Sequence, residues 1–190
     1  KRSLLSSFWL PLAGSVMDIS AVIAAAEGAF LLRFWGPIND LYPAVMIPTR
    51  GDYVWFGLVL GLTYVVIGWS YHHYATEVSV PLDREIARIL RGAIFAMGLV
   101  MAAIFFYREF SYSRLTFLLT LALMIPLLVV ARAVYQRMRR SLFKRGIGVL
   151  RIAVWGSGKE AVRLWMNLKD QKSRGFVLVG ALGPAPSADW

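Results

Sequence analysis

Residues 132–163 read RAVYQRMRRSLFKRGIGVLRIAVWGSGKEAVR and mark a change from one kind of structure to another. An apolar segment ends here in a basic cluster, which is followed by a hinge with two glycines, a short apolar strand pattern and a glycine turn. The sequence before this stretch is typical of membrane helices, and the sequence after it is typical of the start of a soluble α/β domain. The basic cluster consists of Arg137, Arg139, Arg140, Lys144 and Arg145.

The composition supports a membrane protein. Of the 190 residues, 58% are hydrophobic and only 17% are charged, which is too apolar for an ordinary soluble domain. The net charge is +10, but Lys and Arg gather at the ends of apolar runs, a pattern that favours membrane lipids as partners and does not favour nucleic acid. The absence of cysteine excludes disulfides, thiol nucleophiles and thiolate metal sites.

Four apolar segments are long enough, or nearly so, to cross the hydrocarbon layer of a membrane. The third is short by itself, so we extend it back to residue 86, and from residue 81 we expect a short amphipathic helix on the membrane surface. Prolines in the segment 36–52 predict a loop without a continuous helix. The four predicted spans are residues 12–35, 53–74, 92–107 and 115–135.

The distribution of basic residues predicts the orientation of these spans, because cationic loops stay in the cytoplasm. The segments on one side hold Lys1, Arg2, Arg84, Arg88, Arg91 and the five residues of the basic cluster. The opposite side holds only Arg33, Arg50, Arg108 and Arg114. We therefore expect both termini in the cytoplasm.

After the fourth span the pattern changes to strand, glycine turn, helix and strand, over residues 149–155, 156–158, 159–169 and 176–182. This order is typical of the opening unit of a doubly wound sheet. The predicted fold is thus a membrane bundle of four transmembrane helices (1–136), a basic cytoplasmic linker (137–148) and an incomplete α/β Rossmann-like domain (149–190).

Gly156, Ser157, Gly158 and Ala161 fit the pattern G-x-G-x-x-A between a strand and a helix. Such a turn brings backbone N–H groups close to a phosphate, so it is a candidate site for a nucleotide cofactor. The acidic residue that would hold the ribose is missing after the second strand, where the chain reads Leu182, Gly183, Pro184. A glycine turn kept only for packing remains the alternative.

Two acidic residues lie within the first predicted span, where an unpaired charge is costly. Asp18 can pair with Arg132 of the fourth span, because both lie near the cytoplasmic ends of their helices. Such a pair is either structural or part of a site for a lipid phosphate. Glu27 has no evident partner and is a weaker candidate for a proton or ligand site. The basic cluster is expected to set the topology and to hold anionic lipid headgroups.

Several stretches together resemble the N-terminal half of bacterial polyprenyl-phosphate sugar-1-phosphate transferases, which initiate exopolysaccharide and O-antigen synthesis. The resemblance rests on Asp18 and Arg132, on FSYSR at 110–114, on RRSLFKRGIG at 139–148, and on RIAVWGSGKEAVRLW at 151–165 with GFVLVGAL at 175–182. Relatives often carry an acidic residue after the second strand, and this chain does not.

The resemblance implies that the four spans precede a domain often called CoA-binding-like, and that a catalytic domain with an Asp-Glu pair and Mg²⁺ follows. Neither the Asp-Glu pair nor another catalytic set occurs in these residues. The resemblance therefore implies a membrane and regulatory part that has no cofactor of its own, contacts polyprenyl phosphate and forms a homodimer. The alternatives are the membrane front end of an NAD-dependent nucleotide-sugar dehydratase or epimerase, and a non-catalytic membrane scaffold.

Overall fold

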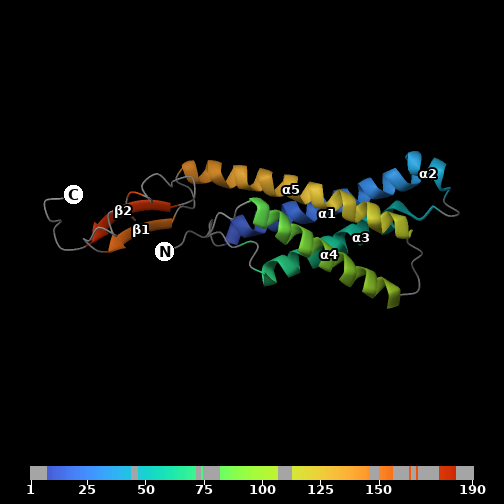
Figure 1. The fold of residues 1–190 in the computed structure, drawn as a ribbon, viewed down its shortest axis with the longest axis horizontal. Helices are drawn as coiled ribbons and strands as arrows, with labels where there is room; N and C mark the ends of the chain where they lie inside the picture. Colours follow the sequence, from blue (N-terminus) through green and yellow to red (C-terminus); the bar gives the residue numbers. More distant parts are fainter. Residues whose placement is uncertain are drawn as a thin grey trace. The chain divides into compact units, whose positions relative to one another are not determined.

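The computed structural model describes residues 8–43, 47–71, 74, 82–106, 113–145, 150–155, 163, 166 and 176–182. These residues form helices and one small sheet (Figure 1). The elements are α1 (Leu10–Phe34), α2 (Pro37–Leu41), α3 (Arg50–Ser70), α4 (Leu82–Phe106), α5 (Arg114–Lys144), β1 (Leu150–Trp155) and β2 (Phe176–Leu182).

Four of the described helices, α1, α3, α4 and α5, are long and apolar enough to cross a membrane. This confirms the prediction of four long apolar helices. One hydrophobic core joins residues from all four, including Val22, Leu60, Met97 and Leu128, each at most 4% exposed. Large apolar side chains such as Trp55, Phe95 and Leu118 face outward, as expected where lipid replaces water.

The helix boundaries differ from the prediction at several points. The prediction of a separate surface helix from residue 81 is wrong, because α4 begins at Leu82 and runs without a break to Phe106. The loop before α3 contains the short helix α2, which Pro37 can begin because a proline in the first turn loses no hydrogen bond. Helix α5 continues through the basic residues to Lys144.

Glycines allow α1 and α3 to approach closely. A Cβ atom at Gly57 would lie 3.0 Å from the Ala26 Cβ and 3.1 Å from the Ile23 Cα. A Cβ at Gly61 would lie 3.3 Å from the Ile19 Cα. Small residues four positions apart thus let the two helix backbones come into contact. Such close packing stabilises pairs of helices in lipid.

Strands β1 and β2 pair in parallel, from Leu150 opposite Phe176 to Trp155 opposite Leu182, with one irregularity after Ile152. The two predicted strands are therefore present, and parallel pairing requires a crossover between them. The Rossmann-like assignment is not supported, since two short strands do not make such a domain. The predicted helix 159–169 lies outside the described residues, apart from Arg163 and Met166, which are helical and exposed.

The contact between α1 and α3 predicts that a larger residue at Gly57 is harmful. We expect Gly57→Val to lower the free energy of unfolding by about 1–3 kcal/mol, because the packed backbone of α1 must move away. Gly98→Val is the matched control, since a Cβ at Gly98 of α4 meets nothing within 4 Å. Unfolding in mixed micelles, followed by circular dichroism, measures both. Equal losses in the two variants would contradict the proposed close contact.

Candidate functional site

A buried ion pair joins the first and last long helices. The Arg132 Nη2 atom donates to the Asp18 Oδ2 atom at 2.7 Å. The Arg132 side chain is 7% exposed and the Asp18 side chain 1% exposed. The structure thus brings together two residues, on α1 and α5, that are 114 positions apart in the sequence.

The helical repeat explains why both charges point inward. On α5 the buried residues Thr116, Thr120, Met124 and Leu128 recur every four positions, and Arg132 is the next member of this row. On α1 Asp18 stands four residues before Val22, which is fully buried. Each charged residue therefore occupies a position of the inward-facing stripe, where only a partner of opposite charge makes it tolerable.

Tyr74 completes this ion pair from the connection that follows α3. Its hydroxyl donates to the same Asp18 Oδ2 atom at 2.7 Å, and its ring centroid lies 4.6 Å from the Arg132 guanidinium carbon. The ring thus offers its negative face to the cation while the hydroxyl supports the anion. Burial, and then the Asp18 charge, raise the pKa of the Tyr74 phenol above its ordinary value, so it stays a donor.

Tyr74 was not predicted as a member of this cluster, although glycines at 14 and 68 mark the places where its ring packs. A Cβ atom at Gly68 would lie 2.8 Å from the Tyr74 Cε2 atom, and one at Gly14 would lie 3.4 Å from Cδ1. The ring therefore fits a space that glycines on α1 and α3 leave open. Nearby, the Trp69 Nε1 atom donates to the Ser15 Oγ atom at 3.0 Å and joins the same two helices again.

The charges of this cluster do not favour anion binding. Asp18 already neutralises Arg132, and the negative charge of Glu85 on α4 also acts on the pair. A phosphate placed here would meet the Asp18 carboxylate, which already accepts hydrogen bonds from Arg132 and Tyr74. The cluster is suited to holding helices together and is poorly suited to the lipid-phosphate role considered above.

Glu27 has a partner, so the expectation that it lacks one is wrong. The Arg50 Nε atom lies 2.6 Å from the Glu27 Oε2 atom. The sequence predicts a loop over residues 36–52, but Arg50 is the first residue of α3, and its side chain reaches Glu27 of α1. The Arg50 side chain is 68% exposed in the protein alone, so this pair is much less enclosed than that of Asp18 and Arg132.

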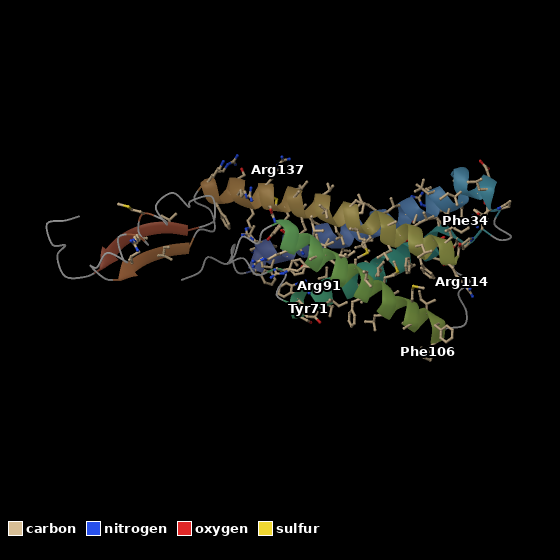
Figure 2. The ribbon with its side chains drawn as sticks, in the orientation of Figure 1. Phe34, Tyr71, Arg91, Phe106, Arg114 and Arg137 are labelled. Atoms are coloured by element: carbon tan, nitrogen blue, oxygen red, sulfur yellow. The ribbon has the colours of Figure 1, made fainter. Side chains whose placement is uncertain are left out.

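The basic cluster lies on the last turns of α5, where Figure 2 labels Arg137. Arg145 follows the helix directly. The glycine turn of Gly156, Ser157, Gly158 and Ala161 lies outside the described residues. Within the described part of the chain, no group of three His, Cys, Asp or Glu side chains could hold a metal ion.

These features define a helical protein with four helices suited to crossing a membrane, a buried charge pair between the first and the last, and a small parallel sheet. Residues 70–187 match the sequence profile of the CoA-binding domain family. Since the match covers more than half of the 190 residues, the chain belongs to the CoA-binding domain family. No curated protein matches the chain at a significant level.

The geometry predicts strong coupling between Asp18 and Arg132. Arg132→Gln leaves a buried carboxylate without its cation and should lower the free energy of unfolding by about 3–5 kcal/mol. The double variant with Asp18→Asn should lose less than the sum of the two single variants, because it removes both charges. A double-mutant cycle of unfolding in mixed micelles measures this coupling.

The pair of Glu27 and Arg50 is the matched control for that cycle. Because the Arg50 side chain is 68% exposed, we expect a coupling below about 1 kcal/mol between Glu27→Gln and Arg50→Gln. A buried pair that coupled no more strongly than this one would contradict the prediction that burial strengthens the interaction between Asp18 and Arg132.

Proposed function

We propose that this chain is the membrane-anchoring, regulatory and dimerisation part of a polyprenyl-phosphate glycosyl-1-phosphate transferase. Such an enzyme moves a sugar-1-phosphate from a nucleotide sugar to a lipid phosphate and so begins a surface polysaccharide. The observation that carries the proposal is the match of residues 70–187 to a family whose domain is found in sugar-phosphate transferases. The transfer chemistry and its Mg²⁺ belong to a catalytic domain outside these 190 residues.

The membrane helices support the proposal because the acceptor is a lipid. Four helices able to cross the membrane hold the chain at the surface where a polyprenyl phosphate is found. The excess of Lys and Arg on one side of the predicted spans favours cytoplasmic termini in a bacterial inner membrane. This orientation puts the sheet on the side where nucleotide sugars are made.

In this proposal Asp18, Arg132 and Tyr74 keep the bundle in one arrangement and do not take part in the transfer. Their mutual neutralisation and deep burial support that role. Gly156, Ser157, Gly158 and Ala161 are the candidate site for a nucleotide, with a turn kept only for packing as the alternative, and a homodimer is the expected assembly.

Transfer assays test the proposal directly. We expect membranes from cells that express the gene's full reading frame to move labelled sugar-1-phosphate from a UDP-sugar to polyprenyl phosphate with Mg²⁺. Residues 1–190 alone, purified into nanodiscs, should show no turnover, because they contain no Asp-Glu pair to attack the nucleotide sugar.

Three results would contradict this account. Turnover by residues 1–190 alone would remove the division between membrane and catalytic parts. NAD-dependent conversion of the UDP-sugar, without transfer to lipid, would favour a dehydratase or epimerase. A reporter fused after Trp190 and found outside the cytoplasm would overturn the orientation.

A further inference from the structure

Helix α5 is longer than a membrane span requires. Its 31 residues extend about 46 Å at 1.5 Å per residue, whereas the hydrocarbon layer is about 30 Å thick. If the helix enters the layer near Arg114, it leaves it after roughly 20 residues. The last turns of α5, which carry the basic cluster, therefore lie at the level of the lipid headgroups.

One face of α5 changes from apolar to cationic at this level. Val130 and Val134 are 58% and 49% exposed, as expected of residues that face lipid tails. Arg137 and Lys144 continue this face, Arg140 lies beside it, and all three are exposed. At 3.6 residues per turn, these three side chains leave the helix within about 60° of one another.

Arg139 belongs to a different face of the helix. Its guanidinium carbon lies 5.3 Å from the centre of the Phe143 ring, and Phe143 is 4% exposed. Arg139 itself is only partly exposed. Its cation therefore packs on an aromatic ring, whereas its neighbour Arg140 projects outward.

The three outward cations have no acidic neighbour along their helix. The sequence from residue 132 to residue 145 contains no Asp or Glu, so no acidic partner stands one turn away on α5. At the level where they lie, the abundant anion is the phosphate of a lipid headgroup. Clusters of this kind directly after a membrane helix attract anionic lipids.

We propose that Arg137, Arg140 and Lys144 form a stripe that binds the phosphate groups of anionic phospholipids in the leaflet at the C-terminal end of α5. Arg139 and the buried Arg132 are not part of it, because the first packs on Phe143 and the second is neutralised by Asp18. The inference rests on the membrane placement in the proposed function and is independent of transferase activity.

Adjacent arginines provide the matched test. The full chain in detergent is titrated with phosphatidylglycerol and with phosphatidylcholine of the same acyl chains, and bound lipid is counted by native mass spectrometry. We expect Arg140→Gln to weaken phosphatidylglycerol binding about 5-fold and Arg139→Gln to weaken it less than 2-fold. Removing all three cations of the stripe should weaken it by about 100-fold, and higher salt should reduce the preference over phosphatidylcholine.

Charge-conserving changes show whether a variant has lost binding or has lost its fold. The variant with Arg137→Lys, Arg140→Lys and Lys144→Arg should keep the preference for phosphatidylglycerol, and all variants should remain in the membrane after carbonate extraction. Equal losses for Arg139→Gln and Arg140→Gln would overturn the stripe. Selective binding of polyprenyl phosphate over phosphatidylglycerol would also overturn it, while leaving the proposed transferase function intact. Failure of transfer together with normal lipid binding would contradict the transferase function and leave the stripe intact.

Discussion

The helix bundle depends on the ion pair between Asp18 and Arg132, in which each buried charge needs the other as its counter-charge. Asp18 and Arg132 are almost wholly enclosed, and each would be an expensive isolated charge in a layer without water. Their direct contact, with the hydroxyl and ring of Tyr74, supplies the hydrogen bond and the counter-charge that water would otherwise supply. The Asp18 carboxylate of α1 is therefore tolerated inside the bundle only because the Arg132 guanidinium of α5 lies against it.

The ion pair joins a residue before the family match to a residue within it. Residues 70–187 include Tyr74 and Arg132, whereas Asp18 and most of α3 lie before them. The glycines at 57 and 61 then draw α3 onto α1, and the glycines at 14 and 68 leave space for the Tyr74 ring. The segment before the match is thus built to fit residues within it.

Much of this arrangement could be predicted from sequence, because long apolar segments and paired intramembrane charges leave few alternatives. The four spans and the contact of Asp18 with Arg132 follow from the high cost of unsatisfied polar groups in lipid. The start of α4 at Leu82 was missed, because its charged first turns look like a surface helix when the neighbouring helices are unknown. Tyr74 and the partner of Glu27 were not predicted for a related reason: a residue in a connection, or at the start of a helix that begins earlier than predicted, gives no periodic signal. The doubly wound sheet was inferred from a local pattern, and two strands do not support it.

Exchange of the two charges tests the central claim most directly. The account predicts that Asp18→Arg and Arg132→Asp each prevent stable assembly alone, since each places two like charges in one enclosed site. Combined in one chain, the two changes restore opposite charges to the same place, and the monodisperse folded fraction in detergent should recover most of its original value. A doubly exchanged chain that aggregates as much as either single variant would contradict the claim that this ion pair holds the bundle together.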